Sequence, residues 1–250
     1  MSKPQRSGTS IDGHRILVVG AASGIGQATA DALESRGASV VRADRDAAGL
    51  QSAAGGRETL VLDLTATETV APAIDALVGA GDPVDVLVNC AGITGTTNRR
   101  SHEVSVEELD EVYAVNLRGA FALSRAVLPH MVEREYGRIL HLASIAGKEG
   151  NAGMVAYSAT KAGLIGMVKA MGKEYATTGV TVNAVAPGVI RTPMVAALPT
   201  EQVDYMTAKI PMGRCGTLEE ITELIAWVVS PASSFTTGFT FDLSGGRAVY

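Results

Sequence analysis

The chain has 250 residues, of which 46% are hydrophobic and only 4% aromatic, and this suits one globular α/β domain with an aliphatic core. There are 21 basic and 26 acidic residues, which give a net charge of −5. Basic residues never form a run longer than two, so the charge pattern of a nucleic-acid-binding protein is missing, and we expect no nucleic-acid partner.

Neither the N-terminal segment nor the cysteines point to export, membrane insertion or metal binding. Residues 1–13 are polar, and no later segment reaches the roughly 18 uninterrupted apolar residues of a membrane span. Cys90 and Cys215 belong to no metal-ligand motif, and the histidines have no ligand spacing. We therefore expect a flexible tail over 1–13, one domain over 14–250, a cytoplasmic location, no membrane partner and no metal.

Short segments rich in Val, Ile and Leu alternate with helical patterns along the whole chain. The expected strands are Arg15–Gly20, Ser39–Ala43, Thr59–Asp63, Val84–Asn89, Gly137–Leu142, Val180–Val185 and Phe239–Leu243. The expected helices are Ile25–Arg36, 47–55, 66–79, 105–134, 154–177 and 218–229. Such alternation implies right-handed crossovers and therefore a doubly wound, parallel, seven-stranded sheet.

The segment at about 189–216 differs from the rest of the chain. It has no strand pattern and carries Pro193, Pro199 and Pro211, directly after an expected strand end. A long excursion at that position predicts a substrate lid. A surface excursion with helices of its own is the alternative.

A glycine-rich turn joins the first expected strand to the first expected helix. Gly20, Gly24 and Gly26 let the backbone approach a pyrophosphate, which the positive end of the helix attracts. Asp44 follows at the end of the second strand, where its carboxylate can accept hydrogen bonds from a ribose 2′-hydroxyl. An ordinary turn is the alternative, and Arg42 and Arg45 flank Asp44, but the context predicts a Rossmann-like site for NAD.

Polar residues and glycines also follow later strands at the same edge of the sheet. They are Asp63, then Asn89 to Gly92, then Pro187 and Gly188. Ligands of open α/β sheets lie beyond the carboxyl ends of the strands, so an extended cofactor is expected here. Taken singly, Asp63 could instead cap a helix, and Asn89 could satisfy backbone groups between strands.

Tyr157 and Lys161 lie four residues apart at the start of an expected helix and therefore share one face. A free tyrosine has a pKa of about 10, and a nearby ammonium group favours the phenolate. A surface pair is the alternative. Ser144, at the end of the fifth strand, lies at the same edge as the glycines, and this favours an acid/base site.

These ordered motifs resemble the short-chain dehydrogenase/reductase family from about Arg15 to Gly246. The resemblance implies that Tyr157 is the acid/base, Ser144 orients the substrate oxygen, Lys161 holds the nicotinamide ribose and Asn116 holds a water next to it. It also implies a set of cofactor contacts. These are Gly20, Ser23, Gly24, Ile25, Gly26, Asp44, Asp63, Leu64, Asn89, Ala91, Gly92, Tyr157, Lys161, Pro187, Gly188, Ile190 and Thr192.

The resemblance further implies a small-molecule substrate and a homotetramer. The loop after Ser144 is similar to that of sugar-acid dehydrogenases and of 3-oxoacyl carrier-protein reductases, and we favour a sugar acid or polyol. Lys148 and Asn151, with Arg191 from the lid side, are the candidate substrate-binding residues. An extended-type epimerase would need a larger C-terminal domain, and a silent dinucleotide sensor would be expected to lack Tyr157 or Lys161.

Overall fold

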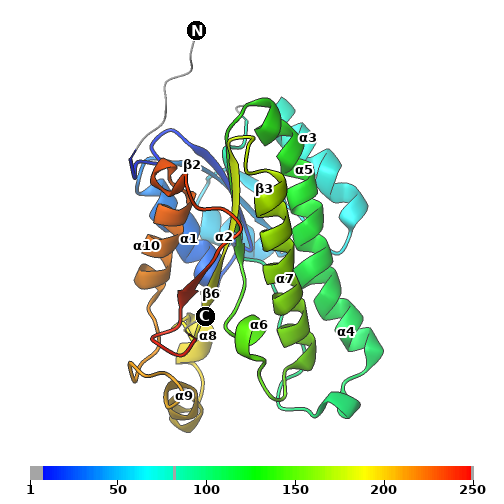
Figure 1. Ribbon diagram of the computed structural model, residues 1–250, viewed down its shortest axis with the longest axis vertical. Coiled ribbons are helices and arrows are strands. Elements are labelled where there is room, and N and C mark those ends of the chain that lie inside the picture. The colour runs from blue at the N-terminus through cyan, green and yellow to red at the C-terminus, as the bar shows by residue number, and fades with distance from the viewer. Residues whose placement is uncertain (1–7, 81–82, 249–250) are drawn as a thin grey trace.

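The chain forms one seven-stranded parallel sheet with helices on both faces, as Figure 1 shows. The computed structural model describes residues 8–80 and 83–248. The strands lie in the order β3-β2-β1-β4-β5-β6-β7, and every pairing is parallel. The predicted doubly wound fold is confirmed, and the strand order reverses between β1 and β4, where such sheets bind ligands.

The helices and strands follow the predicted order closely. The strands are β1 (Arg15–Val19), β2 (Ser39–Asp44), β3 (Thr59–Val61), β4 (Val86–Asn89), β5 (Gly137–Leu142), β6 (Val180–Pro187) and β7 (Thr240–Leu243). The α-helices are α1 (Gly24–Glu34), α2 (Ala47–Ala54), α3 (Thr67–Gly79), α4 (Val106–Tyr113), α5 (Ala120–Glu133), α6 (Ala146–Glu149), α7 (Val155–Glu174), α8 (Pro193–Ala196), α9 (Thr200–Thr207) and α10 (Leu218–Val229). Short 3-10 turns, η1 (Ser101–Glu103) and η3 (Pro231–Ser233), complete the set with one π-helical segment, η2 (Ala114–Gly119).

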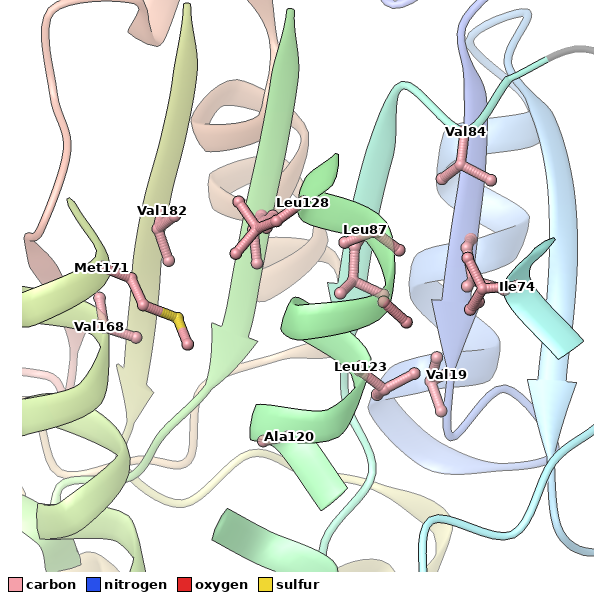
Figure 2. Packing of buried hydrophobic residues seen from close by; sticks show 14 of the residues in the cluster. Val19, Ile74, Val84, Leu87, Ala120, Leu123, Leu128, Val168, Met171 and Val182 are labelled. Atoms are coloured by element: carbon pink, nitrogen blue, oxygen red, sulfur yellow. The ribbon is translucent and has the colours of Figure 1, made fainter. Parts of the chain in front are cut away.

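Two aliphatic clusters hold the helices on the sheet, one on each face. Alternate residues of β1 and β4, such as Val18 and Val88, pack beneath α1 and α10. The intervening residues, such as Val19 and Leu87, pack beneath α3, α5 and α7, and Figure 2 shows this second cluster. Because a strand turns successive side chains to opposite faces, central strands such as β1 and β4 need buried residues at every position.

The long helix predicted over 105–134 is the main difference in secondary structure. It is divided into α4, η2 and α5, and η2 has the wider π-helical turn. Within η2, the Asn116 side chain bonds to the backbone of Ile93, and Gly119 packs so closely on Leu64 that a Cβ there would lie 2.7 Å from the Leu64 Cβ. These two contacts of η2 lie where the regular helix is interrupted, a common place for a π turn.

The predicted N-terminal tail is partly packed on the domain, and the predicted lid segment contains two short helices. Residues 1–7 of the tail lie outside the described residues, whereas Ile11 is 1% exposed and packs in the core. The segment at 189–216 carries α8 and α9, and a bridge between Ile190 and Gly216 joins its two ends. Within the described ranges, no helix is both long and apolar enough to cross a bilayer.

Candidate active site

The glycine turn after β1 is packed against the turn after β4. A Cβ on Gly20 would lie 2.8 Å from the Ala91 amide nitrogen, and a Cβ on Gly26 would lie 1.9 Å from the Gly20 carbonyl oxygen. Gly20 also has a φ of +84°, in the left-handed region. Only glycine fits at these two positions, so the backbone forms a shallow, side-chain-free surface at the switch point of the sheet.

The N-terminus of α1 lies at this turn with an open positive end. Ser23 occupies the cap position without a side-chain hydrogen bond to the helix, and the first turn has no acidic residue. Ile25 therefore lies in a helical turn whose backbone N–H groups and dipole favour an anion. Thr192, at the start of the lid segment, is close by, because a Cβ on Gly24 would lie 4.0 Å from its methyl group.

Asp44 ends β2 beside the glycine turn. One carboxylate oxygen accepts a hydrogen bond of 3.1 Å from the Ala22 amide, and the other accepts one of 3.0 Å from the Asp46 amide. Arg42 does not share this edge, since its guanidinium is buried and bonds to Asp31 and Glu34 of α1. Of the two flanking arginines, Arg42 is therefore held by α1, whereas Arg45 is exposed; the side chain at the strand end is an anion.

Asp63 and Leu64 follow β3. One carboxylate oxygen of Asp63 accepts hydrogen bonds of 2.8 Å from both the backbone amide and the hydroxyl of Thr65. The backbone bond, and then the hydroxyl bond, lower the pKa of Asp63. Asp63 thus braces its own turn while remaining exposed, and Leu64 is buried against Gly119.

Tyr157 lies in the first turn of α7 and hydrogen bonds with Ser144, the buried residue that follows β5. Burial raises the pKa of Tyr157, and the hydrogen bond with Ser144 opposes this only in part. The expected lowering of this pKa by Lys161 is therefore not found in the protein alone, where burial and Ser144 are the two causes of the shift. The pair of hydroxyls nevertheless faces the carboxyl edge, where one can donate to or accept from a substrate oxygen.

Lys161 connects the tyrosine to the cofactor edge. Its ammonium nitrogen lies 5.6 Å from the Tyr157 ring centroid and donates a 2.6 Å hydrogen bond to the Leu142 carbonyl. A Cβ on Gly92 would lie 3.2 Å from the same nitrogen. Burial lowers the pKa of Lys161 to about 8 and raises that of the neighbouring Cys90 thiol to about 12.

Asn116 has a bracing role in this structure. Its amide oxygen accepts a 2.8 Å bond from the Ile93 amide, and its amide nitrogen donates to the Ile93 carbonyl at 2.8 Å and to the Thr160 hydroxyl at 3.2 Å. The side chain is thus used within the protein. A water held by Asn116, as the resemblance implies, would have to bind its backbone within η2, where the π turn changes the regular helix pairing.

Pro187 ends β6, and Gly188 leads the chain into the lid segment. The Gly188 amide donates a 2.9 Å bond to the Leu243 carbonyl, which fixes this turn against β7. Ile190 is buried and bridges to Gly216, whereas Thr192 caps α8. The structure thus brings these four predicted cofactor residues to the same edge as the glycine turn.

The residues matched by a family model correspond to this edge and the sheet behind it. The model described as enoyl-(acyl carrier protein) reductase matches residues 20–248. The chain belongs to the short-chain dehydrogenase/reductase family. It is 42% identical to the 2-dehydro-3-deoxy-L-rhamnonate dehydrogenase (NAD(+)) of Sphingomonas sp. strain SKA58, with 95% of this chain and 96% of the relative covered.

Two further similarities show the breadth of this family. The 3-oxoacyl-[acyl-carrier-protein] reductase of Vibrio cholerae is 38% identical, over 95% of this chain and 98% of the relative. The crystal structure of gox2181 is 30% identical and superimposes with a TM-score of 0.91, over 97% of this chain and 98% of that one. The chain is therefore an oxidoreductase of this family with its Rossmann-like fold.

Two of the predicted substrate-binding residues, Lys148 and Asn151, already have partners within the protein. Lys148 pairs with Asp242 at 2.7 Å, and the Asn151 amide oxygen accepts a 3.0 Å bond from Arg247. Arg247 also pairs with Glu149 at 3.0 Å. Sequence reasoning overlooked Arg247, although a cation directly after the Gly-Gly pair that follows the last strand was a usable signal.

Arg191 is the third predicted substrate-binding residue, and a metal site is not expected from the sequence. Arg191 is exposed at the start of the lid segment, and its backbone amide donates to the Gly216 carbonyl at 2.8 Å. Among the described residues, no group of three or more His, Cys, Asp or Glu side chains gathers in a way that could hold a metal ion.

Proposed function

We propose that the protein is an NAD-dependent dehydrogenase that interconverts a secondary alcohol and a ketone on a small sugar acid. The observation that carries the chemistry is the convergence of Tyr157, Ser144 and Lys161 beside the glycine turn. The observation that favours the substrate class is the 42% identical relative named as a 2-dehydro-3-deoxy-L-rhamnonate dehydrogenase using NAD(+).

NAD fits the side chains at the carboxyl edge. The pyrophosphate would lie on the turn formed by Gly20, Gly24 and Gly26, against the open end of α1. Asp44 would accept from the ribose hydroxyls, whereas a 2′-phosphate would meet its negative charge, and Arg42 is held away by α1. Further proposed contacts are Ser23, Ile25, Asp63, Leu64, Asn89, Ala91, Gly92, Pro187, Gly188, Ile190 and Thr192.

Bound NAD would supply the hydride acceptor, and the protein would handle the proton. In oxidation, Tyr157 accepts the substrate hydroxyl proton while Ser144 holds the same oxygen in place. The buried ammonium of Lys161 would hold the nicotinamide ribose, and Asn116 would hold a water through its backbone. Burial raises the pKa of Tyr157 in the protein alone and thus favours the protonated hydroxyl. The positive charge of the oxidised nicotinamide ring would act in the opposite direction and favour the phenolate once NAD is bound.

A polar wall next to Ser144 supports a charged or hydroxylated substrate. Lys148 with Asp242, and Arg247 with Glu149 and Asn151, place ions along the loop that leads to Tyr157. We propose that Lys148, Asn151 and Arg191 contact the substrate, with Arg247 as the residue that orients Asn151. An acyl chain lying on this wall would desolvate charged groups without new partners, which is costly.

The lid and the assembly are further parts of the proposal. The segment at 189–216 is joined at its base by the Ile190–Gly216 bridge, and its exposed Met194 and Met212 are available to close over a substrate. A groove of about 410 Å³ between α5 and α7, lined by Phe121, Leu128 and Met171 among others, supports packing of these helices in a homotetramer. The C-terminal Ala248, Val249 and Tyr250 are expected from the sequence to reach a neighbouring subunit, but Ala248 is buried and bonds to Ser244, while Val249 and Tyr250 lie outside the described residues.

A substrate panel tests the proposed function directly. We expect NAD reduction, followed by nicotinamide absorbance, with 3-deoxy sugar acids that carry a secondary hydroxyl, and little activity with 3-oxoacyl thioesters and reduced cofactor. The 38% identity to 3-oxoacyl-[acyl-carrier-protein] reductases makes those thioesters the necessary comparison. A kcat/KM for a thioester above that for every sugar acid would replace the proposal with the acyl reductase.

A further inference from the structure

A buried histidine next to the cofactor edge carries the further inference. His141 lies on β5, is 0% exposed, and pairs in register with Asn89 of β4. Both side chains lie on the face of the sheet that α3, α5 and α7 cover, within the row that starts at Val19 of β1. Figure 2 shows the neighbouring aliphatic residues of this face, including Val19 and Leu123. A polar side chain in such surroundings must find partners for both ring nitrogens.

The partners of His141 fix the hydrogen positions of a whole chain of groups. The Ser124 hydroxyl donates to the Ala120 carbonyl at 3.0 Å, so toward His141 Nε2, at 2.9 Å, Ser124 can only accept. His141 therefore carries its hydrogen on Nε2, and Nδ1 is an acceptor. The amide nitrogen of Asn89 lies 3.3 Å from Nδ1 and donates to it, which turns the Asn89 oxygen toward the Ala91 amide.

The direction of each bond depends on the next one in the chain. If the Asn89 amide were flipped, its nitrogen would face the Ala91 N–H, and its oxygen would face the lone pair of His141 Nδ1. If His141 carried its hydrogen on Nδ1, Ser124 and Asn89 would each meet the wrong kind of group. The carbonyl of α5 at one end and the Ala91 amide at the other therefore support one arrangement only.

The far end of this chain is the cofactor edge itself. Ala91 is the residue whose backbone contacts Gly20, where a Cβ would lie only 2.8 Å from the Ala91 amide nitrogen. On the other side of His141, the carbonyl of the next residue, Leu142, accepts the hydrogen bond of Lys161. His141 thus stands between the turn that faces the glycine loop and the lysine of the catalytic helix.

We propose that His141, as the neutral Nε2–H tautomer, is a positioning residue that holds the Asn89–Gly92 turn in the shape that binds the dinucleotide. It touches neither the substrate nor the reacting atoms and acts through Asn89. Burial and the nearby Lys161 cation both favour the neutral ring that this role needs. The inference rests on the proposed function only in taking NAD as the ligand.

The test combines a spectroscopic measurement with cofactor binding. In nitrogen NMR of the cofactor-free protein, we expect His141 to show a protonated Nε2 and an unprotonated Nδ1 at neutral pH. His141→Leu removes both ring nitrogens, so Asn89 and Ser124 lose their hydrogen bonds to this residue. The Kd of NAD should rise about tenfold, the effect expected for a lost hydrogen bond to a buried group. The kcat at saturating NAD should change by less than about threefold, because the reacting groups are untouched.

Two variants separate positioning from general stability. His141→Asn keeps an acceptor toward Asn89 and should restore the Kd of NAD to within about threefold of the wild type. His130→Leu, a change at a partly exposed histidine of α5 that pairs with Asp75, should leave the Kd unchanged. If His141→Leu fails to fold, the NMR tautomer and the His141→Asn titration still decide the proposal.

The opposite outcomes are equally distinct. A protonated Nδ1, a charged ring, or a His141→Leu protein that binds NAD like the wild type would overturn the positioning role. So would a fall in kcat as large as the rise in Kd. A wild-type protein that binds no NAD would instead contradict the proposed function, because the role of His141 is compared only between proteins that bind the cofactor.

Discussion

The contact between α6 and α7 fixes the position of the Lys161 backbone, and a single added methyl group can disturb it. Gly147 lies so close to α7 that a Cβ there would be 2.6 Å from the Lys161 carbonyl carbon and 2.8 Å from the Ala162 amide nitrogen. Ordinary contacts begin at 3.4 Å, so the backbones must separate by about 0.8 Å, the difference between 3.4 and 2.6. No flexible side chain can absorb this movement.

Gly147→Ala should therefore damage catalysis more than folding. A displacement near 1 Å of a catalytic group costs on the order of 10²-fold in rate, whereas overpacking costs about 1–3 kcal/mol of unfolding free energy. The assay is kcat for NAD reduction at saturating substrate, together with unfolding in urea. Gly166→Ala is the matched control, because Gly166 is exposed on α7 with nothing within 4 Å of a Cβ.

The control should behave in the opposite way. Gly166→Ala should stabilise the protein by about 0.5–1 kcal/mol through helix propensity and leave kcat unchanged. A Gly147→Ala enzyme with the kcat of the wild type would refute the argument that this close contact positions Lys161. A loss of kcat in both variants would show that α7 tolerates no added methyl group, whatever its surroundings.

Three further predictions concern the cofactor, acid stability and the substrate. Asp44→Ser should raise kcat/KM for NADP relative to NAD by on the order of tenfold, and an unchanged ratio would contradict the role of the carboxylate. Burial lowers the pKa of His141 from 6.5 to about 3, so the unfolded chain binds the proton that the folded protein excludes. The contribution of His141 is complete above its unfolded pKa and falls as the pH drops toward 3, by about 2 kcal/mol between about pH 7 and pH 5. Urea titrations of His141→Asn should lack that slope, and those of His130→Asn should retain it. Lys148→Ala leaves Asp242 without this ion pair and should raise KM for an acidic substrate more than it lowers kcat, while an unchanged KM would remove Lys148 from the substrate site.

The sequence predicted the sheet because burial on both faces left a clear signal in the central strands, such as β1 and β4. Runs such as the one from Ile16 to Val19 are aliphatic throughout, and glycines or polar residues mark the carboxyl ends of the strands. The edge that carries Gly20, Asp44 and Ser144 follows from this topology, since parallel strands all end on one side. Local pattern and fold agree here.

The remaining features depend on contacts between distant segments, which periodicity does not encode. The break at Asn116 is associated with its bonds to Ile93, and the capture of Arg42 by α1 depends on how two elements pack. From the sequence, His141 could be interpreted only as a strand residue, because the sheet and α5 bring its partners Asn89 and Ser124 to it. The same holds for the raised pKa of the tyrosine, which results from burial.

The Tyr157→Phe variant tests the central claim most directly. It keeps the aromatic ring and removes the hydroxyl that Ser144 meets, so the Kd of NAD should stay within about threefold of the wild type. Turnover of the best sugar-acid substrate, followed by NAD reduction, should fall on the order of 10²–10⁴-fold, the usual contribution of acid/base catalysis. A Tyr157→Phe enzyme that binds NAD and keeps near-normal kcat would contradict the account.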